Sequence, residues 1–193
     1  LRNSSAASDV YKRQGKGTNV KNILHYFKGN KTVNIAFIGT NNSQSGAIFH
    51  AKSYQIPYLI FQKEDLNNPD KVIKKLNQEN IDLLVLAGFL LKLPALFIHN
   101  FKGNIINIHP SLLPKYGGKG MYGDHIHKEV LKNKEKYTGI TFHYVNENYD
   151  EGKIISQHPI LISDSETLST LKEKISQLEL LNYPIIISSF KDE

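Results

Sequence analysis

Hydrophobic residues along the chain form short continuous runs that alternate with stretches of helical spacing. The continuous runs are typical of strands covered on both faces of a parallel sheet. Apolar residues at every third or fourth position mark the helical stretches. The pattern predicts strands over 32–39, 57–61, 81–87, 104–109, 138–146 and 153–161, and helices over 20–28, 46–54, 69–79, 94–100, 125–131 and 166–180. Because strands and helices alternate, the sequence predicts an α/β fold with a parallel sheet.

The first 14 residues differ from the rest of the chain. Residues 1–14 are small, polar and basic, and they show neither a strand period nor a helix period. They resemble translated adapter or vector sequence, so we interpret them as a non-native segment; a disordered tail is the alternative. Residues 15–193 are predicted to form a single domain with a full core.

Composition narrows the class of protein. The chain has no cysteine, which excludes disulfides and thiolate metal sites. The apolar runs are far shorter than a membrane span, and no signal peptide is recognisable, so we expect a cytoplasmic protein without a membrane partner. The net charge is +6 and the pI is about 9.3. We interpret this charge as scattered surface lysines or a preference for an anionic metabolite. A nucleic-acid-binding module is the alternative, which a steep salt dependence of binding would favour.

Two polar side chains end the strand predicted over 104–109. Asn107 and His109 stand two residues apart, and because a strand repeats every two residues, both leave the same face. Pro110 and Pro114 then restrict the path of the following loop. Ligands of open α/β sheets bind beyond the carboxyl ends of strands. The pair is therefore a candidate catalytic site, although a strand end can carry these residues without any function.

Asp150 lies in the loop between the last two predicted strands. Such a loop aspartate can simply bond to the local backbone. Together with Asn107 and His109, however, it makes a coherent set, because a carboxylate orients an imidazole and favours its protonated form. The amide and the imidazolium can then stabilise a developing oxyanion. With no Gly-x-Ser-x-Gly motif and no cysteine, this set suits acyl transfer without a protein nucleophile.

A second candidate site lies at the N-terminus of the helix predicted over 20–28. Two glycines, Gly15 and Gly17, flank Lys16 and precede Thr18 and Asn19. Glycines at a helix N-terminus let the backbone approach a phosphate closely, and the free N–H groups favour an anion. The pattern is common, and the apolar strand that should precede it is absent from residues 1–14.

Three motifs of the chain together resemble those of the folate-dependent formyltransferases. They are Asn-Ile-His-Pro-Ser-Leu-Leu-Pro over 107–114, Gly-Ile-Thr over 139–141 and Asp-x-Gly over 150–152. The resemblance covers about residues 15–190 and implies a Rossmann-like formyltransferase fold. Such a fold has a mostly parallel sheet with helices on both faces and an antiparallel C-terminal part. The family's first strand, which lies inside the sheet, is expected to be missing from this chain.

The resemblance also implies roles for individual residues. Asn107, His109 and Asp150 would be catalytic. The ribonucleotide-binding set would be Gly15, Lys16, Gly17, Thr18, Asn19 and Glu179. The folate-binding set would be Phe89, Leu90, Leu91, Lys92, Leu93, Asn146, Glu147 and Tyr149. Supporting roles would fall to His143, Ser111 and Lys63, where Lys63 is the basic residue nearest to the place of a family arginine; His143 could equally be an ordinary strand histidine.

The reaction that the resemblance implies moves the formyl group of 10-formyltetrahydrofolate to the amine of glycinamide ribonucleotide, a step of de novo purine biosynthesis. The partners would be these small molecules and no nucleic acid, in a monomer or homodimer, and no metal is expected. Related alternatives are formyl transfer to methionyl-tRNA and hydrolysis of formyltetrahydrofolate. A folate- or nucleotide-binding but inactive variant is a further alternative, because the first strand is expected to be missing.

Overall fold

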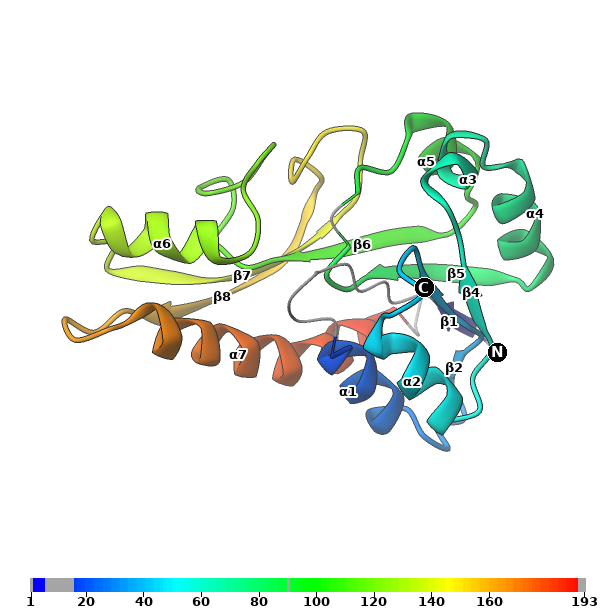
Figure 1. The fold of residues 1–193 in the computed structure, drawn as a ribbon, viewed down its shortest axis with the longest axis horizontal. Coiled ribbons are helices and arrows are strands. Elements are labelled where there is room, and N and C mark those ends of the chain that lie inside the picture. Colours follow the sequence, from blue (N-terminus) through cyan, green and yellow to red (C-terminus); the bar gives the residue numbers. More distant parts are fainter. Residues whose placement is uncertain (1, 6–15, 90, 191–193) are drawn as a thin grey trace. The chain divides into compact units, whose positions relative to one another are not determined.

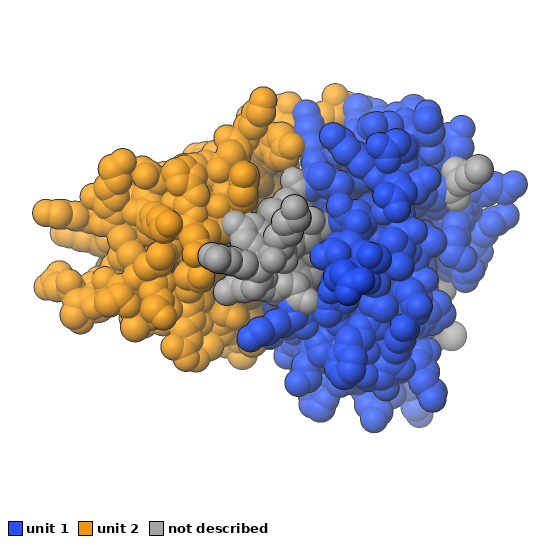
Figure 2. All heavy atoms as spheres, viewed as in Figure 1, with its two compact units in different colours: residues 1–106, 183–193 blue, residues 107–182 orange. Residues whose placement is uncertain are grey.

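The structure of the protein is a computed structural model, which describes residues 2–5, 16–89 and 91–190. The chain divides into two compact units (Figure 2). Unit 1 comprises residues 1–106 and 183–193, and unit 2 comprises residues 107–182. Each unit is described in turn, and the single domain expected over 15–193 stays a prediction.

Unit 1 contains parallel strands in two sheets. In the first, β1 (Arg2–Ser5) pairs in parallel with both β2 (Val33–Ile35) and β5 (Ile81–Leu86). In the second, β3 (Ile38–Thr40) pairs in parallel with β4 (Tyr58–Ile60). The expectation that the first strand is missing is therefore wrong. Backbone N–H and C=O groups make the ladder, so a segment without an apolar period can still form a strand.

The single strand predicted over 32–39 is also wrong, because the chain forms two strands there. Val33 pairs with β1, whereas Ile38 pairs with Tyr58 of β4. Residues 35–38, where the partner changes, are all apolar, so the local sequence shows no break between the two strands. Strand partners are set by long-range pairing, which the local pattern does not reveal.

The helices of unit 1 follow the apolar spacing of the sequence. They are α1 (Thr18–Tyr26), α2 (Gly46–Ser53), α3 (Lys63–Asn67), α4 (Asp70–Gln78) and α5 (Ala95–Asn100). In Figure 1, α1 and α2 lie side by side, and α3 lies close to α4 and α5. The sequence analysis missed α3, which begins with a capping box between Gln62 and Asp65. Pro69 precedes α4, and no side-chain hydrogen bond caps that helix.

The strand β6 (Asn104–His109) has the predicted bounds, and the boundary between the units falls within it, after Ile106. Unit 2 continues with α6 (Asp124–Lys132) and the antiparallel pair β7 (Tyr137–Tyr144) and β8 (Ile154–Leu161). A Cβ at Gly139 would lie 2.1 Å from the carbonyl oxygen of His158, so this close pairing requires glycine. The structure thus has parallel strands followed by an antiparallel C-terminal hairpin, as predicted. Helices on both faces of one sheet remain a prediction.

The last helix, α7 (Leu168–Ser189), is longer than predicted. The sequence analysis ended it near residue 180. The cap is Thr167, whose Oγ1 accepts a hydrogen bond from the backbone N–H of Thr170 at 3.2 Å. Proline interrupts helical hydrogen bonding, yet the helix passes through Pro184. In unit 1 the buried Tyr183 holds this stretch, because its hydroxyl donates to the carbonyl oxygen of Leu86 at 2.6 Å.

No helix within the described ranges has the length and apolar character needed to cross a membrane.

Candidate active site

The C-terminal end of β6 presents Asn107 and His109 within unit 2. Residues of a strand that are two apart share a face, and the structure confirms that both side chains meet groups from the β7–β8 hairpin. His109 is buried, with 4% of its surface exposed. Burial strengthens its polar interactions because little water competes for them.

Asp150 lies beside His109, as the sequence analysis predicted. Its Oδ2 is 3.4 Å from Nδ1 of His109 and accepts a hydrogen bond from the backbone N–H of Gly118 at 2.9 Å. The Asp150 backbone is left-handed, with φ of 56°. Two residues on, a Cβ at Gly152 would lie 1.7 Å from the carbonyl oxygen of Tyr144, so the loop closes tightly against the end of β7. This tight loop places the carboxylate of Asp150 beside the ring of His109.

Burial alone would raise the pKa of Asp150, because it disfavours the charged carboxylate. The hydrogen bond and charge of His109, followed by the N–H of Gly118, outweigh this effect and hold the pKa below its usual value. Asp150 is therefore ionised at neutral pH.

Both ring nitrogens of His109 face acceptors. Nε2 lies 2.7 Å from the carbonyl oxygen of Tyr116, and a carbonyl can only accept, so Nε2 carries a proton. Nδ1 faces the Asp150 carboxylate. The imidazolium satisfies both contacts, whereas a neutral ring protonated on Nε2 would turn a lone pair toward the carboxylate.

His143 on β7 has the opposite arrangement. Its Nδ1 lies 2.8 Å from the carbonyl oxygen of Tyr144 and therefore donates. Its Nε2 lies 3.2 Å from Nδ2 of Asn107, which can only donate, so Nε2 accepts. Burial is the main reason why the pKa of His143 is lowered, although Tyr144 and Asp150 act against it. The neutral ring protonated on Nδ1 fits both bonds, and it directs the amide nitrogen of Asn107.

The loop after β6 is fastened by residues that the sequence analysis did not assign. Thr141 Oγ1 donates to the carbonyl oxygen of Ser111 at 2.7 Å and accepts from the backbone N–H of Leu113 at 3.0 Å. Gln157 Nε2 donates to the carbonyl oxygen of Leu113 at 2.8 Å. Ser111, predicted as a supporting residue, uses its own hydroxyl to bond the carbonyl oxygen of Lys115 at 2.6 Å. Thr141 and His143 are two apart on β7, a spacing that could have indicated their common face.

A model of the family described as formyl transferase matches residues 12–187, a range that contains all of the residues just described. The chain belongs to the formyl transferase family. It is 33% identical over 186 residues to the chloroplastic phosphoribosylglycinamide formyltransferase of Arabidopsis thaliana, a match that covers 93% of this chain but 63% of the relative. It is also 33% identical over 178 residues to the Bacillus subtilis phosphoribosylglycinamide formyltransferase, covering 90% of this chain and 89% of that protein.

Solved structures in this family have the same fold. The crystal structure of phosphoribosylglycinamide formyltransferase from Anaplasma phagocytophilum aligns with a TM-score of 0.86 at 28% identity, over 100% of this chain and 87% of that one. The chain spans less than two thirds of the length of the plant relative. The likeness therefore establishes the family and the fold.

The phosphate loop predicted from the family resemblance lies in unit 1. Gly17 precedes α1 with φ of 63°, and a Cβ there would lie 2.8 Å from the backbone nitrogen of Ala47 in α2. Among the described residues no side chain caps α1, and the N-terminus of a helix favours an anion. The carbonyl oxygen of Lys16 is held by Nε2 of His50 at 2.7 Å. Thr18 and Asn19 open the helix, whereas Gly15 lies outside the described residues.

The other predicted binding residues are distributed over both units. Lys63 is exposed at the start of α3 in unit 1, and Glu179 lies on α7 in unit 2. Among the folate set, Leu90 lies outside the described residues. Phe89 and Leu93 are buried and line an apolar cavity of about 40 Å³ within unit 1, so their side chains belong to its core.

The remaining members of the folate set are half-buried or exposed. In unit 1, Leu91 is half-buried and Lys92 is exposed. Asn146, Glu147 and Tyr149 are exposed on the loop of unit 2 that carries Asp150. Whether these two stretches bind folate together remains a prediction.

Within the described ranges, no three histidine, aspartate or glutamate side chains are grouped so that they could hold a metal ion.

Proposed function

We propose that this chain transfers the formyl group of 10-formyltetrahydrofolate to the amine of glycinamide ribonucleotide. The observation that carries the proposal is the hydrogen-bonded set of Asn107, His109, His143 and Asp150 in unit 2. Two close relatives, the Arabidopsis and Bacillus proteins, are named for this activity. The set suits direct attack of an amine on the formyl carbon, because it offers donors to the oxyanion and a carboxylate to hold charge.

In the proposed reaction, the substrate amine adds to the formyl carbon and the carbonyl oxygen becomes an oxyanion. Nδ2 of Asn107, directed by His143, would donate to this oxygen. His109 would donate through Nε2, with the substrate oxygen replacing the carbonyl oxygen of Tyr116 as acceptor. Asp150 would stabilise the imidazolium and take part in relaying the proton that leaves the amine. The folate leaves as its amine, which accepts a proton as the intermediate collapses.

The loop of Lys16, Gly17, Thr18 and Asn19 would bind the phosphate of the ribonucleotide through backbone N–H groups. Glu179 and Lys63 are further candidates for the same substrate. The loop of Asn146, Glu147 and Tyr149 and the segment of Phe89, Leu91, Lys92 and Leu93 would border the folate. We further propose a cytoplasmic location, a monomer or homodimer, and a reaction without metal.

The test is a formyl-transfer assay with glycinamide ribonucleotide and 10-formyltetrahydrofolate. We expect turnover by the chain and a loss of about 10³-fold or more in His109→Ala, because that variant loses an oxyanion donor and its ion pair. The matched control is His25→Ala, since His25 is exposed on α1. Deformylation of the folate without formylated ribonucleotide would instead favour the hydrolase alternative. A folded chain that consumes neither substrate would contradict the proposal.

A further inference from the structure

One short backbone segment of unit 2, residues 116–118, contacts both His109 and Asp150. The carbonyl oxygen of Tyr116 accepts a hydrogen bond from Nε2 of His109 at 2.7 Å. The backbone N–H of Gly118 donates to Oδ2 of Asp150 at 2.9 Å. The position of this segment therefore determines whether the imidazole keeps its acceptor and the carboxylate keeps its donor.

The backbone of this segment has a conformation that tyrosine does not favour. The angle φ is 56° at Tyr116 and 94° at Gly118. Glycine adopts such values readily, whereas a residue with a Cβ does not, so the cost falls on Tyr116. The segment is also packed closely, because a Cβ at Gly117 would lie 3.3 Å from Cβ of Asp150. A tyrosine persists in such a conformation where its surroundings stabilise it.

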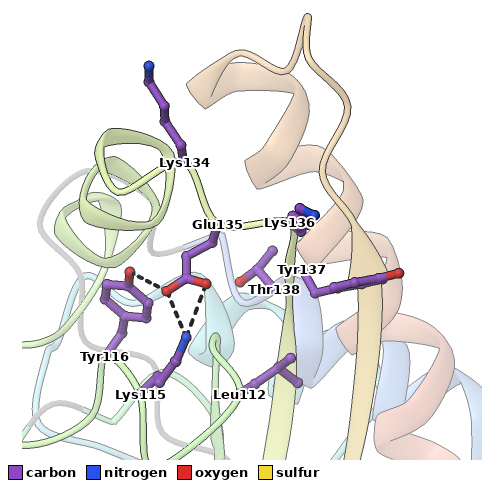
Figure 3. Close-up of a pocket in the computed structure, with 8 residues that line it drawn as sticks. All are labelled: Leu112, Lys115, Tyr116, Lys134, Glu135, Lys136, Tyr137 and Thr138. Atoms are coloured by element: carbon purple, nitrogen blue, oxygen red, sulfur yellow. Dashed lines mark hydrogen bonds and ion pairs between the residues drawn. The ribbon is translucent and has the colours of Figure 1, made fainter.

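The Tyr116 side chain is held at its far end. Its hydroxyl donates to Oε1 of Glu135 at 3.0 Å and accepts from Nδ2 of Asn133 at 2.9 Å. Glu135 also accepts from Nζ of Lys115 at 2.9 and 3.1 Å. Figure 3 shows the hydroxyl of Tyr116 and the ammonium group of Lys115 both directed to this carboxylate. Glu135 thus holds two successive side chains next to the carbonyl group that meets His109.

The two contacts of Glu135 are not equivalent. The side chain of Lys115 is 67% exposed, and an ion pair with an exposed lysine contributes little, because water and salt screen it. Tyr116 is half-buried. Hydrogen bonds from Lys115 and then from Tyr116 hold the pKa of Glu135 below its usual value, so the carboxylate is ionised at neutral pH. A hydroxyl bonds more strongly to an ionised acceptor than to a neutral one, and the bond from Tyr116 is therefore the contact that can fix the segment.

The other bonds that fasten this loop act on an earlier part of it. Thr141 and Gln157 bond to the backbone N–H and carbonyl groups of Leu113, three residues before Tyr116. The hydroxyl bond to Glu135 acts at the very residue whose carbonyl oxygen meets the imidazole. The two sets of bonds can therefore be tested separately.

We propose that Glu135 is a positioning residue for formyl transfer and acts through the hydroxyl of Tyr116. The inference rests on the proposed function, in which Nε2 of His109 donates to the oxyanion. While Tyr116 is held, its carbonyl oxygen keeps a proton on Nε2 and fixes the orientation of the ring before the substrate oxygen takes over as acceptor. A donor that is oriented in advance lowers the barrier of the reaction without binding the substrate more tightly.

Steady-state formyl transfer by Glu135→Ala and Tyr116→Phe tests the proposal. Each variant removes the bond between the two side chains, so we expect kcat to fall about tenfold while the Michaelis constants change less than about twofold. The double variant should fall no further than either single variant, because both changes remove the same bond. Glu135→Gln keeps an acceptor for the hydroxyl and should restore kcat to within about threefold of the wild type. The matched control is Glu129→Ala, which removes another glutamate of unit 2 that pairs with a lysine, Lys132, and should leave kcat within about twofold.

A measurement without substrate separates this inference from the proposed function. The Nε2 proton of His109 should exchange slowly with water in NMR spectra of the wild type and of Glu129→Ala, because the carbonyl oxygen of Tyr116 accepts it. In Glu135→Ala and Tyr116→Phe the exchange should be about tenfold faster or more, because the segment is released. If the wild type transfers no formyl group but the exchange rates differ in this way, the proposed function fails while the positioning of His109 by Glu135 is supported.

Three outcomes would overturn the inference. The first is a kcat of Glu135→Ala equal to that of Glu129→Ala. The second is a higher kcat in Glu135→Ala, which would mean that the carbonyl group of Tyr116 obstructs the substrate instead of preparing His109. The third is an unchanged exchange rate of the Nε2 proton in both Glu135→Ala and Tyr116→Phe.

Discussion

His109 and His143 belong to one set of polar side chains, but their surroundings differ. The two imidazole rings have different hydrogen-bond partners. His109 faces acceptors with both nitrogens, the carbonyl oxygen of Tyr116 and the carboxylate of Asp150. The Nδ1 of His143 faces an acceptor, the carbonyl oxygen of Tyr144, and its Nε2 faces the amide donor of Asn107 at 3.2 Å, with Oδ1 of Asp150 farther away at 3.8 Å. Both rings are buried, so burial does not explain the difference. The hydrogen-bond partners decide whether an imidazole serves as a charged donor or as a neutral support.

The largest effect on activity is expected from Asp150→Asn, which removes the carboxylate that distinguishes the surroundings of His109. Asparagine tolerates the left-handed backbone at this position and keeps the shape of the side chain, but it lacks the charge that favours the imidazolium. We expect kcat to fall about 10³-fold, equal to about 4 kcal/mol in the barrier. The measurement is steady-state formyl transfer, with Asp164→Asn as control because Asp164 is exposed in the same unit. Activity within about twofold of the wild type would show that the charge is not required.

A third buried histidine, His127 of α6, extends the comparison of histidine surroundings. Its effect can be measured as the dependence of the free energy of unfolding on pH. Burial lowers its pKa to about 4, against the opposing charge of Asp124. The unfolded chain binds this proton near pH 6.5, so stability from His127 is present above that pH and is lost as the pH falls toward 4. The loss amounts to roughly 3 kcal/mol. Chemical denaturation at several pH values should show it.

His127→Leu should reduce this pH dependence between 6.5 and 4, because leucine does not titrate. His25→Leu, at an exposed position, should leave the slope unchanged. An unchanged slope in His127→Leu would mean that another group, such as His143, dominates that range.

Substituting His143 tests its role as a neutral acceptor. In His143→Leu the amide of Asn107 loses this acceptor, so we expect kcat to fall about 30-fold, equal to about 2 kcal/mol. His143→Gln can place an oxygen near the position of Nε2 and should restore kcat to within about threefold of the wild type. The Michaelis constants should change less than kcat, because the amide acts on the oxyanion. If both variants lose activity equally, His143 does more than accept a hydrogen bond.

The smallest effect is expected at Gln157, which fastens the loop that supplies Tyr116. Gln157→Leu removes the bonds to the carbonyl oxygen of Leu113 and to Oγ1 of Thr141, and we expect a loss of about 1 kcal/mol in the free energy of unfolding. Gln177→Leu, an exposed position on α7, is the control. A stability equal to that of the control would show that Thr141 alone is enough to hold the loop.

Local pattern predicted much of the fold and the centre of the site. The apolar run of β6 set its bounds, and the two-residue spacing placed Asn107 and His109 on one face. The meeting of His109 with Asp150 was predicted from the chemistry of the set and from the family motif. These features depend on a short stretch of sequence or on a motif that extends over many residues.

The errors arose where long-range pairing decides the structure. The split of 32–39 into β2 and β3 depends on different partner strands, and the pairing of Arg2–Ser5 uses backbone groups alone. The capping box of α3 was readable from Gln62 and Asp65 but was missed. The supporting bonds of Thr141 and Gln157 reach across 28 to 44 residues, which residue type does not reveal.

The most direct test of the contrast is to locate the ring protons by ¹⁵N NMR at neutral pH. Histidine ring nitrogens report separately whether each carries a proton. We predict that His143 is neutral with its proton on Nδ1, and that Nε2 of His109 carries a proton because it faces the carbonyl oxygen of Tyr116. A proton on Nε2 of His143, or a bare Nε2 in His109, would contradict the hydrogen-bond assignment on which the proposed formyl transfer depends.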